Sequence, residues 1–237
     1  MPDSGTIYLI PTVLAEETAP AVIPAQVAQC IAGLNYFIVE NARTARRYIK
    51  TMAPEKVIES LQIVVIDKNS SEAEVKKALE PVTKGKNAGI ISEAGCPGVA
   101  DPGAEVVKWA HRAGVKVVPL VGPSAILLAL MGSGFNGQSF AFHGYLPIEK
   151  KDRVQAIRNL EKDMLQRDQT QIFMETPYRN NQLLSDLLQQ LNPTTQLCIA
   201  ANISGSNEFI KTTTVAKWQG KLPDIHKQPA VFLIYRS

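Results

Sequence analysis

The chain has 237 residues, of which 45% are hydrophobic, and a formal net charge of +3. This length and apolar content suffice for one large domain or two small ones, and the small net charge gives no argument for nucleic-acid binding by itself. Cys30, Cys96 and Cys198 lie far apart, without His at ligand spacing, so we expect no disulfide framework, no metal site and a reducing compartment. The N-terminus lacks a signal-peptide pattern and the longest apolar stretch, Ala125 to Met131, is too short to span a bilayer, which predicts a cytoplasmic protein without membrane association.

The first half of the chain alternates short β-branched runs with helical patterns. This alternation is typical of a mostly parallel, doubly wound sheet with helices on both faces. Ligands of such sheets bind beyond the carboxyl ends of the strands, so every loop that follows a strand is a candidate site. The predicted strands are 7–10, 36–39, 63–66, 89–91 and 116–121, and the predicted helices are 22–33, 43–52, 71–84 and 102–112.

The second half of the chain has a different order of strand-like and helical segments, which predicts a mixed α/β domain. Strands at 139–142 and 172–174 flank a charged helix near 149–166, and a further helix covers 180–191. The runs that follow are too close together for intervening helices, so we expect them to pair as antiparallel strands. These runs are 197–200, 209–218 and 230–235.

The segment Gly132 to Gly137 formally matches GxGxxG. A dinucleotide-binding loop needs a strand before it and a helix after it, whereas here an apolar helix (124–131) precedes and a strand follows. We therefore interpret the segment as a linker that ends the helix. The predicted domains are an α/β domain over 1–132 and a mixed α/β domain over 133–237.

The loop over 92–103 reads Ser-Glu-Ala-Gly-Cys-Pro-Gly-Val-Ala-Asp-Pro-Gly and follows the predicted strand 89–91. Gly95 and Gly98 permit positive φ and leave backbone polar groups uncovered, and Pro97 stiffens the turn between them. We expect Asp101 to cap a helix whose first residue is Pro102. Such a loop predicts a small-ligand site lined by backbone; the alternative is an ordinary strand-to-helix turn.

This loop resembles the central motif of the tetrapyrrole methylase superfamily, in the branch of the bacterial 16S ribosomal RNA 2′-O-ribose methyltransferases. The resemblance extends along nearly the whole chain. Four further segments carry it, namely Glu-Asn-Ala-Arg at 40–43, Gly-Pro-Ser-Ala at 122–125, Phe-His-Gly-Tyr-Leu-Pro at 142–147 and Met-Glu-Thr-Pro-Tyr-Arg at 174–179. The chain departs from this branch on what should be the acceptor side, at Leu14 to Glu16, Asn41, Tyr178, Ala201 and Asn202.

The resemblance implies a two-domain homodimer that holds S-adenosylmethionine (SAM) in the cleft between its domains and methylates a ribose 2′-oxygen of ribosomal RNA. Ser124 could also cap the helix that follows it. The cofactor contacts that the resemblance implies are Pro11, Ala94, Gly95, Cys96, Val99, Ala100, Ser124, Ala125, Met174, Ala200, Pro229 and Ala230.

A ribose hydroxyl is a weak nucleophile, so a base that removes its proton would help the transfer. Our candidates are Glu40 and Glu175, each just after a predicted strand. Either could instead be a helix-cap carboxylate or the ion-pair partner of Arg43 or Arg179.

Arg43, Arg46, Arg47 and Lys50 are spaced to lie on one face of a helix. Such a stripe suits a phosphate backbone, and the three arginines together with Arg179 are the candidate RNA-binding residues. The alternative is a solvated helix face. Other possible acceptors are a tetrapyrrole or a modified protein. The changes at Asn41 and Asn202 leave open a non-catalytic module that binds SAM or another ligand.

Overall fold

A computed structural model describes residues 4–218, 220 and 222–236, and the chain forms two compact units, Met1–Ser124 and Ala125–Ser237. The division falls at the start of helix α6 (Ala125–Ser133), whereas the sequence placed a boundary near its end. The reason is that α6 packs on three strands of the second unit. None of the helices among the described residues combines the length and the apolar character that crossing a bilayer requires.

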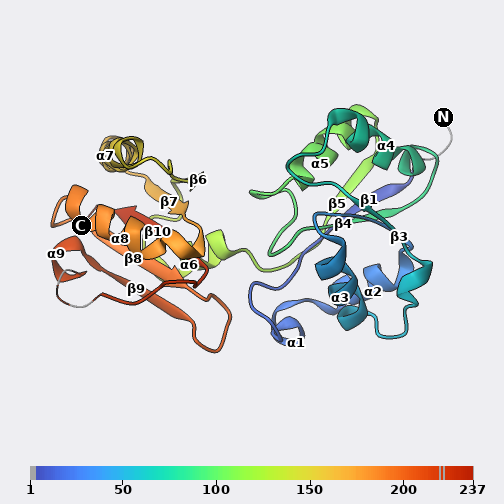
Figure 1. Cartoon of the computed structure of the whole chain (residues 1–237), viewed down its shortest axis with the longest axis horizontal. Helices are drawn as coiled ribbons and strands as arrows, with labels where there is room; N and C mark the ends of the chain where they lie inside the picture. The colour runs from blue at the N-terminus through green and yellow to red at the C-terminus, as the bar shows by residue number, and fades with distance from the viewer. Residues whose placement is uncertain (1–3, 219, 221, 237) are drawn as a thin grey trace. The chain divides into compact units, whose positions relative to one another are not determined.

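The first unit is built on a five-stranded sheet that is parallel throughout, in line with the mostly parallel sheet that the sequence predicted (Figure 1). The strand order, which the sequence did not predict, is β3-β2-β4-β1-β5. All residues of β2 and β4 are buried, because helices cover both faces of a parallel sheet and leave no alternating pattern. The strands are β1 (Thr6–Ile10), β2 (Tyr36–Val39), β3 (Gln62–Val65), β4 (Ala88–Ile91) and β5 (Lys116–Pro119).

Helices α1 to α3 cover one face of this sheet, and α4 and α5 cover the other (Figure 1). Pro24 lies between α1 and α2, so the single helix predicted over 22–33 is interrupted there. The chain leaves β1 toward one face and β4 toward the other, which makes the carboxyl ends of these neighbouring strands a topological switch point. The helices are α1 (Ala19–Val22), α2 (Ala25–Gly33), α3 (Ala42–Met52), α4 (Glu72–Thr83) and α5 (Gly103–Arg112), with a 3-10 turn η1 (Ile58–Ser60).

The second unit contains a mixed sheet with the order β6-β7-β10-β8-β9, in which only β6 and β7 run parallel. The prediction that the last three strands pair antiparallel is confirmed. Its strands are β6 (Phe140–Tyr145), β7 (Thr170–Met174), β8 (Gln196–Ala201), β9 (Phe209–Thr214) and β10 (Ala230–Tyr235). Its remaining helices are α7 (Lys150–Arg167), η2 (Pro177–Arg179), α8 (Asn180–Gln190) and α9 (Val215–Trp218).

The prediction that a strand runs from 209 to 218 is wrong in its last four residues, which form α9. Val215 and Trp218 are both buried in the core of the second unit. Residues three positions apart point to opposite faces of a strand but to the same side of a helix. One helical turn therefore buries both side chains.

A buried ion pair joins α7 to α8. The Arg153 side chain donates from Nε to Asp186 Oδ2 at 2.8 Å, and its Nη2 lies 2.7 Å from the same oxygen. The two side chains are only 6% and 1% exposed. Nη1 of Arg153 also donates to the carbonyls of Pro147 and Ile148, so this one guanidinium fixes both helices and the segment that enters α7.

Candidate active site

The loops that follow β1, β4 and β5 meet at the carboxyl edge of the first unit's sheet. The Thr12 N–H donates to the Gly95 carbonyl at 2.8 Å, which joins the first two loops by an antiparallel bridge. The Cys96 thiol donates to the Pro123 carbonyl at 3.3 Å, which ties the third loop to the second. Gly122 packs so closely on Pro11 that a Cβ added to it would lie 2.1 Å from the Pro11 Cβ. Three segments far apart in the sequence thus form one continuous surface.

Asp101 holds the long loop after β4 in shape. Both of its carboxylate oxygens lie 2.9 Å from the Gly98 N–H, and Oδ1 accepts from the Gly103 N–H at 2.6 Å. Helix α5 begins at Gly103, so the prediction that Pro102 is its first residue is wrong by one position: Pro102 occupies the N-cap, and the Asp101 carboxylate caps the amide of Gly103. Gly98 and Ala100 have left-handed backbones with φ of 86° and 60°. For Ala100, which has a side chain, this conformation is strained and is typical of functional loops.

The predicted cofactor residues of the first unit are all on or beside this surface. Gly95 also has a left-handed backbone, with φ of 74°, and a Cβ there would lie 3.4 Å from the Leu14 side chain. Burial, with the charge of Asp101 adding to it, raises the pKa of the Cys96 thiol, which therefore stays protonated as a donor. Pro11 and Gly95 are buried, Cys96 and Ser124 are half-buried, and Ala94, Val99 and Ala100 are exposed.

The predicted cofactor residues of the second unit lie mostly at one end of its sheet. Val231 pairs with Met174 on one side and with Ala200 on the other, and Ala230 precedes it. The Pro229 carbonyl accepts from the Asn202 N–H at 2.9 Å. Ala125 stands apart from these residues as the first residue of α6. Their part in cofactor binding stays a prediction from the resemblance.

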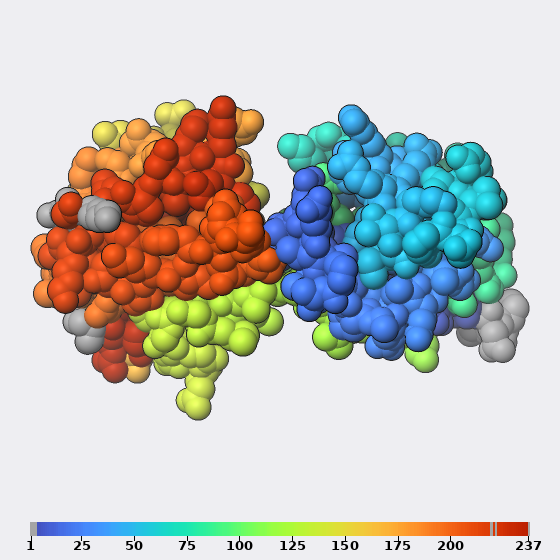
Figure 2. Space-filling model, turned by 90° about the horizontal axis from the view of Figure 1, so that it is seen from below, coloured from blue at the N-terminus to red at the C-terminus, as the bar shows by residue number. Residues whose placement is uncertain are grey.

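A cavity of about 670 Å³ opens next to the bridge between the loops after β1 and β4. Its walls are the loop from Thr12 to Pro20, one side of α3, and residues 91–94. Figure 2 views the first unit from the side of α1 to α3, with the loop after β1 in dark blue and α3 in lighter blue. The Tyr48 hydroxyl donates to the Pro11 carbonyl at 2.7 Å and so holds α3 against this loop.

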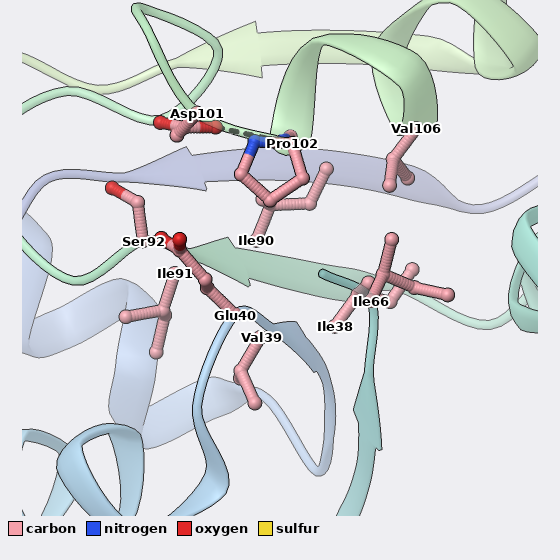
Figure 3. Close-up of a pocket in the computed structure, with 11 residues that line it drawn as sticks. Ile38, Val39, Glu40, Ile66, Ile90, Ile91, Ser92, Asp101, Pro102 and Val106 are labelled. Atoms are coloured by element: carbon pink, nitrogen blue, oxygen red, sulfur yellow. Dashed lines mark hydrogen bonds between the residues drawn. The ribbon is translucent and has the colours of Figure 1, made fainter. Parts of the chain in front are cut away.

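Two buried hydroxyl groups at this edge of the sheet have no partner. Thr12 is 4% exposed and Ser92 is 7% exposed, and neither Thr12 Oγ1 nor Ser92 Oγ has a hydrogen-bond partner among the residues that the structure describes. A buried hydroxyl left unpaired costs about 1–3 kcal/mol. A polar ligand in the cavity would satisfy the Thr12 hydroxyl, whereas the Ser92 side chain lies beside Glu40 on the other side of the sheet edge (Figure 3). The sequence signal for them was a polar residue within two positions of the end of an apolar strand, and neither residue was predicted from it.

Glu40 lies in a second and much smaller pocket of about 10 Å³ on the other side of the sheet edge. Figure 3 shows its side chain beside Ser92, with Asp101 nearby and with apolar walls that include Ile66. Burial raises the pKa of Glu40 and the nearby carboxylates of Asp101, Glu93 and Asp67 raise it further, against the opposing effect of the Glu93 N–H that donates to Oε2 at 3.2 Å. Glu40 is therefore a better base than an ordinary carboxylate, but it does not line the large cavity.

Glu175 is buried and forms an ion pair with Arg179, at 2.6 Å between Oε1 and Nη2. Burial alone would raise the pKa of this carboxyl, but the hydrogen bonds from Arg179 and from the Thr176 N–H outweigh it and leave the pKa below its usual range. The sequence left open whether Glu175 is a base or the partner of Arg179. The structure shows the ion pair, which makes Glu175 a weak proton acceptor.

The predicted basic residues on α3 are all exposed. Asn41, which stands where the resembling branch has an acid, caps this helix, and its Oδ1 accepts from the Arg43 N–H at 2.9 Å. Arg47 lies 4.0 Å from Glu16, and the Lys50 ammonium turns to the Lys56 carbonyl at 3.2 Å. Within the described part of the chain, the side chains of Arg43 and Arg46 make no hydrogen bond or ion pair, so two of the four cations stay available to a ligand.

The family model of the tetrapyrrole (corrin/porphyrin) methylases matches the sequence over residues 18–219. The chain belongs to this family. It is 25% identical over 98% of its length to the ribosomal RNA small subunit methyltransferase I of Buchnera aphidicola, of which it covers 78%. It is 31% identical over 89% of its length to the protein of the same name from Bacillus subtilis, of which it covers 68%.

Among solved structures, the chain is similar to uroporphyrin-III C-methyltransferase from Thermus thermophilus, crystallised with S-adenyl homocysteine. The TM-score is 0.60 and the sequence identity 16%, over 98% of this chain and 97% of that one. The predicted superfamily and α/β fold class are confirmed, as is the class of enzyme, a methyltransferase with SAM as its methyl donor.

Proposed function

We propose that this protein transfers the methyl group of SAM to a ribose 2′-hydroxyl of small-subunit ribosomal RNA. The observation that carries the proposal is the cavity with the orphaned Thr12 hydroxyl beside a backbone-lined loop, at the topological switch point of the sheet. The names of the relatives support ribosomal RNA as the acceptor. The three free cysteines are in keeping with a cytoplasmic location.

The loop surface of the first unit fits SAM in its chemistry. SAM supplies an electrophilic methyl group on a sulfonium, so the protein needs to orient it and to keep water away rather than to activate it. The left-handed turns at Gly95 and Gly98 expose backbone donors and acceptors to a ligand. The residues that would hold it here are Pro11, Ala94, Gly95, Cys96, Val99, Ala100 and Ser124.

The direct test is transfer of a tritiated methyl group from SAM to small-subunit RNA purified from a strain that lacks this protein. We expect label in that RNA, at a position that resists alkaline cleavage because the 2′-oxygen is methylated, and none in RNA from the parent strain. Label in a tetrapyrrole or in a ribosomal protein, with none in RNA, would contradict the proposal. SAM binding by calorimetry without transfer to any of these would favour the non-catalytic module.

The free cations of α3 lead to a prediction about RNA affinity. The double variant Arg43→Ala with Arg46→Ala should weaken RNA binding and reduce the slope of log affinity against log salt by about 1.4–1.8, since each phosphate contact contributes about 0.7–0.9. A filter-binding titration between low and moderate salt measures this slope. Lys77→Ala with Lys116→Ala removes the same charge from exposed positions elsewhere in the first unit and should leave the slope nearly unchanged. Equal slopes for the two double variants would rule out a contribution of α3 to RNA binding.

We also propose that the protein is a homodimer and that α6 contributes to its interface. This helix is apolar on all sides, and Leu127 and Met131 are 50% and 77% exposed. The variant Met131→Glu should therefore sediment as a monomer at concentrations where the native chain is a dimer. Leu165→Glu alters another exposed apolar residue, 59% exposed on α7, and should not change the sedimentation coefficient. A native chain that is monomeric at all concentrations would disprove the dimer.

A further inference from the structure

Glu93 lines the large cavity, as do Glu16 and Glu17, and it is the lining carboxylate that follows β4 next to Ser92. The Thr44 hydroxyl, which lines the same cavity from α3, donates to Glu93 Oε1 at 2.5 Å. The backbone N–H of Glu93 donates to Glu40 Oε2 at 3.2 Å. The residue is thus held at its backbone by one neighbour and at its side chain by another, which is how a reactive group is kept in position.

The second carboxylate oxygen of Glu93 is the atom left for a ligand. Among the described residues, Oε2 accepts no hydrogen bond, whereas Oε1 is occupied by Thr44. A carboxylate oxygen in the wall of a cavity can accept the proton of an entering hydroxyl.

The cavity also carries a group that would orient such a ligand. Its volume of about 670 Å³ is within the range of pockets that enclose small organic molecules. Thr12 offers a hydroxyl that can donate and accept, and it is more than nine-tenths buried. A nucleoside that has left its stack presents base-edge and ribose groups of matching chemistry. The small pocket of Glu40 has no room for one, at about 10 Å³.

We propose that Glu93, oriented by Thr44, is the catalytic base, and that the cavity beside it receives an unpaired nucleoside whose ribose hydroxyl is the acceptor. This rests on the proposed function. As the hydroxyl oxygen forms its bond to the methyl carbon, its proton passes to Glu93 Oε2 and the carbon–sulfur bond breaks with its electron pair left on sulfur. The proton then leaves Glu93 to solvent, since this side chain is exposed.

The test compares kcat, KM for RNA and SAM affinity across variants of the full chain. Glu93→Gln should lower kcat by about 10²–10⁴-fold, the contribution typical of a general base, with KM and SAM affinity within about threefold of the native values. Thr44→Val should give a smaller loss of kcat, and Thr44→Ser should restore it because the hydroxyl is kept. Glu105→Gln, an exposed carboxylate on α5, is the control and should be indistinguishable from the native chain.

Rescue separates proton transfer from a structural role. Added formate should restore part of the kcat of Glu93→Ala in a concentration-dependent way, since a small carboxylate can enter the space vacated, and should not restore Glu40→Ala. Provided that the native chain methylates RNA, either of two results would overturn the assignment of Glu93 as the base. One is a native-like kcat in Glu93→Gln, and the other is rescue by formate of Glu40→Ala alone. Absence of RNA methylation by the native chain would instead overturn the proposed function, and this inference with it.

Discussion

The variant Asp186→Ala is expected to destabilise the second unit by about 3–5 kcal/mol, the cost of leaving one partner of a buried ion pair alone. Arg153 would keep its charge in a site where its side chain is only 6% exposed, and two of its bonds that cross from α7 to α8 would be gone. The remaining contacts to the carbonyls of Pro147 and Ile148 would not compensate a full charge. This exceeds the effect of most single substitutions and is a large part of the stability of a domain of this size.

Urea unfolding monitored by Trp218 fluorescence in a Trp109→Phe background measures this loss, because the remaining tryptophan is buried in the second unit. Asp163→Ala breaks an exposed pair with Arg167 on the same helix and should cost less than about 1 kcal/mol. The double variant Arg153→Met with Asp186→Leu should recover most of the stability, since no buried charge is left unpaired. If Asp186→Ala and Asp163→Ala unfold at the same urea concentration, the Arg153–Asp186 pair contributes no more to stability than the exposed pair does.

The variant Gly122→Ala is expected to weaken SAM binding by about 5- to 150-fold. The added Cβ would lie 2.1 Å from the Cβ and 2.4 Å from the Cγ of Pro11, so the loops after β1 and β5 must separate. Overpacking of this kind costs about 1–3 kcal/mol, equivalent to about a 5- to 150-fold change in affinity. The separation would displace Pro11 and the neighbouring backbone from the surface that we expect SAM to contact.

Calorimetry with SAM, together with circular dichroism to verify folding, measures this effect. The matched control is Gly33→Ala at the end of α2, where an added Cβ meets nothing within 4 Å. Native-like affinity in Gly122→Ala, with both variants folded, would show that the junction of these two loops is not part of the cofactor site.

The architecture of the first unit could be predicted from sequence because its strands are buried on both faces. Such strands read as short continuous apolar runs, and β2 and β4 show this over their whole length. Glycine and proline marked most of the breaks between elements. The exceptions were local: Pro24 interrupts a helix that the apolar pattern suggested was continuous, and α9 replaces the end of a strand because its two buried side chains are three positions apart.

The sequence suggested Glu40 and Glu175 as bases and did not suggest Glu93, which stands two positions after β4, whereas Glu40 directly follows β2. Side chains two positions apart on a strand share a face, so Glu40 lies with Ile38 on the side of α4 and α5, and Glu93 lies with Ile91 on the side of α1 to α3. Which helices cover which face depends on the direction of the crossover connections, and the cavity exists on one face only. The orphaned hydroxyls of Thr12 and Ser92 are likewise defined by what surrounds them rather than by their place in the chain.

The carboxylate of Asp101 has a consequence for the kinetics of the site. Because it closes a ring of hydrogen bonds with the amides of Gly98 and Gly103, the glycine-rich loop keeps its shape through contacts within itself. The loop has therefore already lost its conformational entropy during folding, before any ligand binds. A ligand therefore binds a preformed surface, and its association rate is not limited by ordering of the loop. Selectivity between ligands then depends on their dissociation rates rather than on their association rates.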